Sequence, residues 1–152
     1  MSYGLPDFEE RKSLAEQRSP STKKRLYTWE EVGTMIYQLG NIMEPLIVMA
    51  DYIVGVKRGG LVPAVALSNR FKKPLLVIDP FKFKVDDLPH APLIIVDDVL
   101  DTGKVFNTIT EKLYMKRTYM FGALSRKPWF EEDNNTYTVH ETDAWICFPW
   151  EI

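Results

Sequence analysis

Short apolar runs alternate with helical patterns along most of this chain. The runs are rich in Val, Ile and Leu and lack a 3.6-residue period, so they predict strands that are buried on both faces. They cover residues 51–56, 75–78, 92–96, 119–124 and 137–140. Other segments repeat apolar residues every three or four positions and predict helices. These cover residues 29–43, 61–71 and 105–116, and Thr28 and Glu31 form a capping box for the first of them.

Strands that alternate with helices predict an α/β fold, with a doubly wound, mainly parallel sheet and helices on both of its faces. The 152 residues and the 45% hydrophobic content suit one domain that buries about 70% of the surface of its unfolded chain. We expect a polar arm over residues 1–25, with a short helix that begins near Pro6, and the domain itself over residues 26–152.

The stretch PLIIVDDVLDTGKVFNTI, residues 92–109, carries the clearest chemical signal. Its apolar strand is predicted to end where Asp97 and Asp98 begin, so both carboxylates lie at the carboxyl edge of the sheet. Ligands bind at that edge in open α/β sheets. The acids are therefore candidates for contact with a ligand.

A turn of Asp101, Thr102, Gly103 and Lys104 follows the acids, and a helical pattern begins directly after it. Backbone N–H groups at the start of a helix point into such a turn and favour a phosphate. Acids beside a phosphate site imply one ligand that has a phosphate together with hydroxyls or a metal ion, as a phosphorylated sugar does. The alternative is that these acids only cap a turn and a helix.

The segment VDDVLDTGKV, residues 96–105, resembles the signature of the type I phosphoribosyltransferases at every position but the last. The resemblance implies that Asp97 and Asp98 hold the ribose hydroxyls of phosphoribosyl pyrophosphate. It further implies that Asp101 accepts a proton from the base and that residues 102–104 bind the 5'-phosphate. Mg²⁺ is the implied cofactor, with Asp98 as its protein ligand.

The sequence VKRGGLVP, residues 56–63, follows another predicted strand and places Lys57, Arg58 and Gly59 at the same edge. Glycine lets the backbone approach an anion closely, and the two cations supply charge. By resemblance to the family, this loop binds pyrophosphate and has a cis peptide bond between Lys57 and Arg58. An ordinary turn with surface cations is the alternative.

The sequence SRKPW, residues 125–129, follows the predicted strand 119–124 and resembles the segment that carries the purine-site lysine of the family. A Lys127 donor would recognise the 6-oxo group of hypoxanthine, guanine or xanthine, and would meet the 6-amino group of adenine donor to donor. Arg126 is the alternative contact.

The end of the chain, DAWICFPWEI, resembles the segment that covers the base in 6-oxopurine enzymes. The resemblance implies that Trp145 stacks on the purine and that the backbone of Ile146 reads the edge of the base. Trp150 is expected to anchor this tail in the core. The tail should belong to a small hood made from the chain termini, and it is too short and irregular to predict a further sheet layer.

Two features depart from the family's pattern. Val105 stands where the family usually has a threonine whose hydroxyl also holds the 5'-phosphate, so that phosphate should bind more weakly by ~1 kcal/mol. Only residues 80–91 stand where the family has a long loop that closes over the sugar. Phe81, Lys82, Phe83 and Lys84 within this segment leave open a short flap, a hairpin or a dimer contact.

Composition and charge limit the other classes of function. The formal net charge of −2 gives no general attraction to nucleic acid or to acidic membranes. One cysteine and two isolated histidines exclude a disulfide framework and a cysteine/histidine metal site. The start of the chain has no apolar signal core, so we expect a cytoplasmic protein without a membrane span.

The resemblance thus implies an enzyme, a purine phosphoribosyltransferase that combines phosphoribosyl pyrophosphate with a 6-oxopurine and that forms a homo-oligomer. A second hypothesis is a non-catalytic sensor that binds phosphoribosyl pyrophosphate or a nucleotide and regulates a partner. A pyrimidine-specific relative such as an orotate enzyme is a third. Lys127 and Trp145 favour the purine enzyme, because a sensor of the sugar phosphate alone needs no base site.

Overall fold

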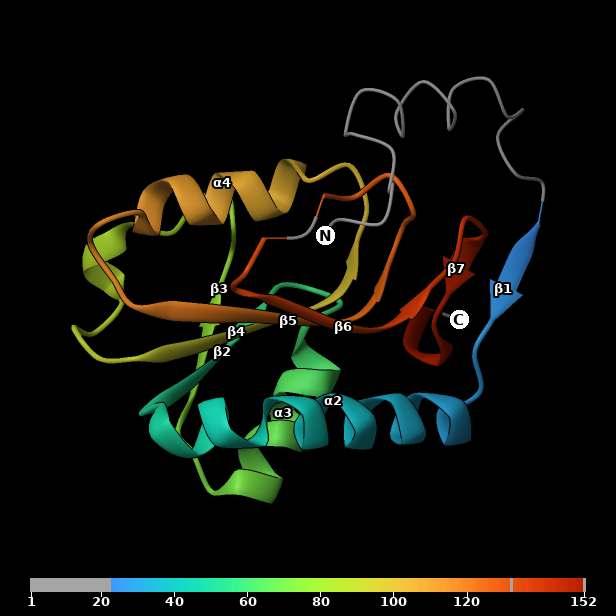
Figure 1. Cartoon of the computed structure of the whole chain (residues 1–152), viewed down its shortest axis with the longest axis horizontal. Helices are drawn as coiled ribbons and strands as arrows, with labels where there is room; N and C mark the ends of the chain where they lie inside the picture. Colours follow the sequence, from blue (N-terminus) through green and yellow to red (C-terminus); the bar gives the residue numbers. More distant parts are fainter. Residues whose placement is uncertain (1–22, 132, 152) are drawn as a thin grey trace, which may run out of the picture.

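A parallel sheet with the strand order β3-β2-β4-β5-β6 forms the centre of the fold (Figure 1). The computed structural model describes residues 23–131 and 133–151, and within them every neighbouring pair of strands in this sheet is parallel. The strands are β2 (Tyr52–Val56), β3 (Leu75–Ile78), β4 (Leu93–Leu100), β5 (Tyr119–Arg126) and β6 (Thr136–Glu141). The predicted α/β fold with a parallel sheet is confirmed.

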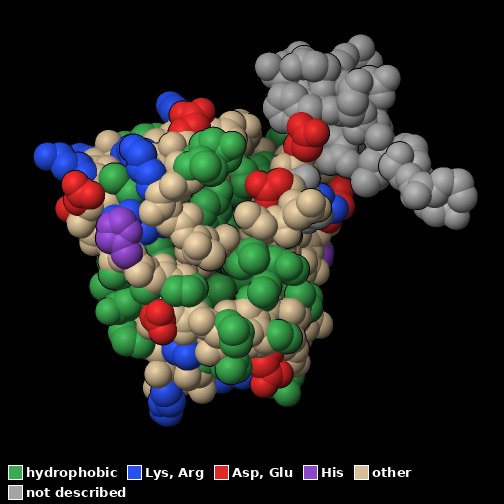
Figure 2. All heavy atoms as spheres, turned by 60° about the vertical axis from the view of Figure 1, so that its left-hand side comes forward, with side chains coloured by type: hydrophobic (Ala, Val, Ile, Leu, Met, Phe, Trp, Pro, Cys, Tyr) green, Lys and Arg blue, Asp and Glu red, His purple; other side chains and the backbone are tan. Residues whose placement is uncertain are grey.

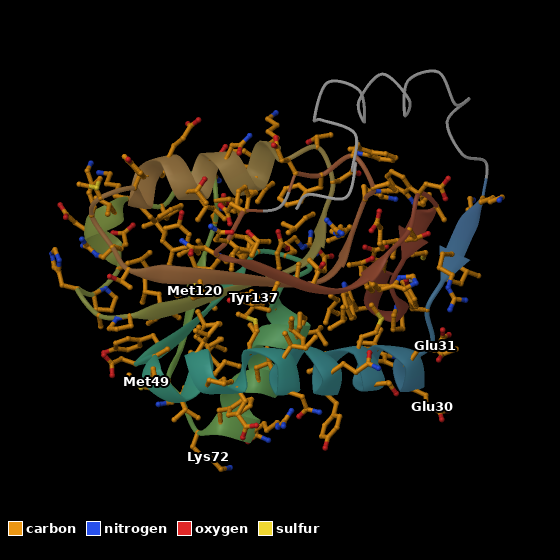
Figure 3. All side chains as sticks on the ribbon, in the orientation of Figure 1. Glu30, Glu31, Met49, Lys72, Met120 and Tyr137 are labelled. Carbon is orange, nitrogen blue, oxygen red and sulfur yellow. The ribbon has the colours of Figure 1, made fainter. Side chains whose placement is uncertain are left out.

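Helices cover both faces of the sheet. α2 (Trp29–Met49) and α3 (Leu61–Phe71) lie on one face, and α4 (Lys104–Leu113) lies on the other (Figure 1). The predicted capping box is present at the start of α2, where the Glu31 N–H donates to the Thr28 hydroxyl at 3.1 Å. Figure 3 shows Glu31 at that end of the helix and Met120 and Tyr137 between the sheet and α2. The alternation of helix and strand therefore produces two hydrophobic cores, one on each face.

β4 is longer than predicted. The apolar run was expected to end before Asp97, but the strand continues through both acids to Leu100. The two neighbouring strands differ in how far they accompany it: β2 pairs with β4 as far as Gly55↔Val96, whereas β5 pairs with it as far as Leu100↔Arg126. The acids consequently lie on the part of β4 that extends beyond β2, at the carboxyl edge of the sheet.

A small separate sheet forms the hood. β1 (Lys24–Leu26) and β7 (Trp145–Cys147) pair in parallel, so the tail, which was expected to be too short and irregular for a further sheet layer, contributes one strand to a two-stranded sheet. Tyr27 joins the hood to the main sheet, because its hydroxyl is hydrogen-bonded to His140 of β6 and its ring stacks on Phe148. The hood thus combines segments from both ends of the described chain, as the predicted hood from the termini requires.

Residues 80–91 are packed against the core on the α4 side of the sheet. Lys112 of α4 donates from Nζ to the carbonyl oxygens of Pro80 and Phe83 at 3.1 and 2.9 Å. Arg117 donates to the carbonyl oxygens of Val85 and Leu88. The Phe83 and Leu88 side chains are buried. This segment is a packed connection with a 3-10 turn at Val85–Asp87 and without the strands that a hairpin requires. The short flap and the dimer contact stay predictions.

The arm expected over residues 1–25, with its short helix, lies outside the described residues as far as residue 22. Among the described residues, no helix combines the length and the apolar character that a membrane span requires. On the face drawn in Figure 2, acidic and basic side chains are interspersed with hydrophobic ones, so this face carries no extended field of one sign.

Candidate active site

Two adjacent carboxylates lie at the carboxyl end of β4. Asp97 is 7% exposed, and its Oδ1 accepts the backbone N–H of Asp98 at 2.8 Å. Oδ1 of Asp98 accepts the N–H of Val99 at 2.8 Å. Burial raises the pKa of Asp97 well above its ordinary value, and the charge of Asp98 raises it further. Burial also raises the pKa of Asp98. Such a pair is suited to cationic or hydroxyl partners that stabilise its charge.

The loop between β2 and α3 touches this acid pair. It starts with Lys57, whose N–H donates to the carbonyl of Ile78 at 2.9 Å, and the peptide bond between Lys57 and Arg58 is cis, as expected. A Cβ atom on Gly59 would overlap the carboxylate of Asp98. Glycine at this position therefore lets the cationic loop lie against the Asp98 carboxylate as it stands.

The turn after β4 leads into α4. Gly103 has φ +85°, a left-handed conformation that favours glycine, and α4 begins at the next residue. The N–H of Lys104 donates to the Thr102 hydroxyl at 3.3 Å, and the N–H of Asn107 donates to the carbonyl of Gly103 at 2.7 Å. The N–H groups at the start of a helix lack acceptors within that helix, so the N-terminus of α4 at this turn favours an anion.

These three motifs line one cavity of about 350 Å³. Its lining contains Lys57, Arg58, Gly59, Asp97, Asp98, Asp101, Thr102, Gly103, Lys104 and Val105, together with three neighbouring apolar residues. Three cations, three carboxylates and a helix N-terminus therefore surround a common space. The arrangement can hold a ligand with anionic groups at two ends and polar groups between them.

The three residues predicted for the base are not part of that lining. Lys127 is 4% exposed, and its ammonium donates to the carbonyl oxygen of Ala144 in the tail. Burial lowers the pKa of Lys127, and the nearby carboxylates of Asp101 and Asp143 oppose this shift. Lys127 therefore lies near Asp101 and also contacts the tail that carries Trp145 and Ile146.

The tail presents its two candidate base contacts differently. Trp145 is 65% exposed, whereas Ile146, the next residue of β7, is buried in the core on the α2 side of the sheet. Trp150 stacks on Phe148 at 4.5 Å between ring centroids, which confirms its expected place in the core. Arg126, the alternative to Lys127, forms an ion pair with Glu141 at 3.1 Å. This ion pair favours Lys127 as the contact for a base.

Comparisons with known proteins agree with this geometry. The xanthine-guanine phosphoribosyltransferase of Cereibacter sphaeroides is 31% identical over 119 residues, which are 66% of this chain and 68% of that protein. That of Idiomarina loihiensis is 26% identical over 87% of this chain and 89% of its own. A crystal structure of a purine phosphoribosyltransferase from Pyrococcus horikoshii matches 85% of this chain and 94% of its own, with a TM-score of 0.71 and 33% identity.

The chain belongs to the type I phosphoribosyltransferase family. No protein-family model matches the sequence. Within this phosphoribosyltransferase, the signature that was recognised in the sequence coincides with one wall of the cavity, and the glycine loop forms part of another.

Trp129 is a residue of this site that the sequence did not reveal. Its Nε1–H donates to Oδ1 of Asp101 at 3.0 Å, and its ring lies near the Lys127 ammonium, 5.8 Å from the ring centroid. The signal for it was its place two residues after Lys127, following a strand that ends at the same edge of the sheet. That signal says nothing about which partner the indole finds.

Replacement of Gly59 by Ala tests the contact between the loop and the acids. The added methyl group must displace the Asp98 carboxylate or the loop, and a displacement of about 1 Å at a reacting site costs roughly 10²-fold in rate. We expect Gly59→Ala to lower kcat/KM for phosphoribosyl transfer by about that factor, measured by formation of nucleotide. Gly33→Ala is the matched control, because a Cβ there meets nothing within 4 Å. Equal activity of the two variants would contradict the contact.

Replacement of Asp97 by Asn tests the electrostatic cost of the acid pair. A carboxyl with a raised folded-state pKa binds protons that the unfolded chain has already lost, so folding stability falls as pH rises above about 4. Asp97→Asn keeps the oxygen that accepts the Asp98 N–H and removes the charge. We expect a larger free energy of unfolding in urea at pH 7, and no gain near pH 4.

The control for this measurement is Asp86→Asn, an exposed carboxyl, which should change the free energy of unfolding by less than about 0.5 kcal/mol. A lower stability of Asp97→Asn at pH 7 would show that the carboxylate stabilises the folded protein.

Proposed function

We propose that this protein transfers the phosphoribosyl group of phosphoribosyl pyrophosphate to a 6-oxopurine, which yields a nucleoside 5'-monophosphate and pyrophosphate. The observation that carries the proposal is the cavity in which the glycine loop, the acid pair and the turn before α4 meet. Xanthine-guanine phosphoribosyltransferase is the name of the curated relatives, which supports a purine as the acceptor.

The cavity gives each part of the donor a partner. The turn of Thr102 to Lys104, with Val105 behind it, takes the 5'-phosphate on its backbone N–H groups. Lys57, Arg58 and the backbone of Gly59 take the pyrophosphate. Asp97 and Asp98 line the same cavity, and their carboxylates accept hydrogen bonds from the ribose hydroxyls.

The reaction breaks the bond from the anomeric carbon to pyrophosphate and forms a bond from that carbon to a purine nitrogen. Positive charge develops on the ribose as the first bond breaks, and the two carboxylates beside the ribose stabilise it. Lys57 and Arg58 stabilise the negative charge of the departing pyrophosphate. Asp101 accepts the proton that the purine nitrogen loses.

Magnesium fits the donor set that is present. Among the described residues no cluster of three or more Asp, Glu, His or Cys side chains could enclose a metal ion. Mg²⁺ needs no such enclosure, because it retains waters and binds substrate phosphates together with one or two carboxylates. Asp98, beside the pyrophosphate loop, would hold it there, and the ion would supply charge neutralisation on the pyrophosphate oxygens.

The base is recognised from the side of the hood. Lys127 donates to the 6-oxo group, Trp145 stacks on the purine at a gain of roughly 1–3 kcal/mol, and the backbone of Ile146 contacts the edge of the ring. The exposed indole of Trp145 and the buried lysine near Asp101 support this assignment. They also favour the enzyme over a sensor of the sugar phosphate alone. A homo-oligomer stays a prediction.

The direct test offers the protein Mg²⁺, phosphoribosyl pyrophosphate and one base at a time, with chromatographic detection of nucleotide. Hypoxanthine, guanine or xanthine should react, and adenine should react more slowly by a factor on the order of 10⁴, because the Lys127 ammonium would face an amino group. Lys127→Met should abolish that preference by loss of the 6-oxopurine reaction. Lys72→Met is the control, since Lys72 lies at the end of α3 away from the sheet (Figure 3). Formation of nucleotide from adenine alone, or from none of the bases, would refute the proposal.

A further inference from the structure

One indole links the two polar groups that the proposed function assigns to the base. Trp129 donates from Nε1 to Oδ1 of Asp101 at 3.0 Å. The Lys127 ammonium lies 5.8 Å from the centroid of the same ring, within range of a weak cation–π interaction. Asp101 and Lys127 therefore both lie next to one rigid side chain.

The backbone fixes the position of Trp129. The N–H of Lys127 donates to the carbonyl of Leu100 at 2.9 Å, which extends the pairing of β4 with β5 by one further hydrogen bond. The N–H of Phe130 then donates to the carbonyl of Lys127 at 3.0 Å and closes a four-residue turn. Pro128 occupies the second position of that turn, where its fixed φ is favourable. The turn therefore delivers the indole to Asp101 from the end of the neighbouring strand.

Phe130 anchors the other end of this turn. It is 3% exposed, and its ring meets Phe106 of α4 edge-on, at 5.2 Å between centroids and an angle of 90°. α4 begins at the phosphate turn, so the same packing fixes Trp129 relative to the residues that follow Asp101. The turn that carries Trp129 is consequently anchored in the core by the residue that follows the indole.

An indole N–H has a particular use beside a proton-accepting carboxylate. It only donates and does not titrate, so it cannot take the proton that Asp101 is to receive. It engages one carboxylate oxygen and leaves the other oxygen available to the purine N–H. We propose that Trp129 is a positioning residue that orients the Asp101 carboxylate toward the purine; this rests on the proposed function.

The first test is Trp129→Phe, which keeps an aromatic ring and removes the N–H donor. An Asp101 carboxylate without its fixed partner is misplaced, so kcat should fall by about 10-fold to 100-fold. KM for phosphoribosyl pyrophosphate should stay within about 2-fold, because the donor's binding groups are untouched. Trp29→Phe is the control, since Trp29 is 59% exposed at the start of α2 and should leave kcat unchanged.

The second test combines Trp129→Phe with Asp101→Asn. If Trp129 acts through Asp101, kcat of the double variant should lie within about 2-fold of Asp101→Asn alone. Independent effects that multiply would overturn the proposal, as would wild-type kcat in Trp129→Phe. If Trp129 had a merely structural role, Trp129→Phe would lower kcat by the same factor in the wild-type protein and in Asp101→Asn.

Two further variants keep the proposal testable if Trp129→Phe does not fold. Trp129→His retains a ring N–H donor, and Trp129→Leu lacks one, so kcat should be higher for the histidine variant by about 10-fold. Equal kcat values would overturn the proposal. A wild-type protein that forms no nucleotide from any base would refute the proposed function, and the role of Trp129 with it; an active wild type with a fully active Trp129→Phe variant would refute the role of Trp129 alone.

Discussion

The contact between the Gly59 backbone and the Asp98 carboxylate is the constraint on which the site depends. It brings a loop with two cations from the end of β2 against two acids on the neighbouring strand β4. A Cβ atom at Gly59 would overlap the Asp98 carboxylate, so a side chain there requires the carboxylate or the loop to move. Burial meanwhile raises the pKa of both acids, because it disfavours their charged forms. We therefore expect the two buried carboxylates to lower the folding stability, and a bound ligand with hydroxyls and cations to compensate for this cost.

Local patterns predicted most of the fold. α3 and β3 have the predicted bounds. The glycine turn before α3 and the lysines after it are local boundary signals, and the sequence shows them directly. The features that local patterns did not predict depend on pairing between strands that are distant in sequence. β4 continues to Leu100 because β5 accompanies it there, and β7 exists because β1, from the other end of the described chain, pairs with it. No local pattern contains that information.

The candidate site shows the same division. The acid pair, the glycine loop and the phosphate turn were each visible as a short motif, and a parallel sheet collects such motifs because its strands end at a common edge. The contact of Trp129 with Asp101 was not visible, because it depends on the register of β5 with β4 and on the turn at Pro128. The packing of residues 80–91 depends likewise on Lys112 and Arg117, which find carbonyl partners about thirty residues earlier.

A crystal structure with Mg²⁺, a 6-oxopurine nucleoside 5'-monophosphate and pyrophosphate would test most directly whether the three motifs bind one ligand set. The nucleotide phosphate should lie on the turn of Thr102 to Lys104, the pyrophosphate on Lys57 and Arg58, and the ribose hydroxyls on Asp97 and Asp98. Phosphate groups bound outside this cavity, or a ribose that contacts neither aspartate, would contradict a phosphoribosyl site at this edge of the sheet.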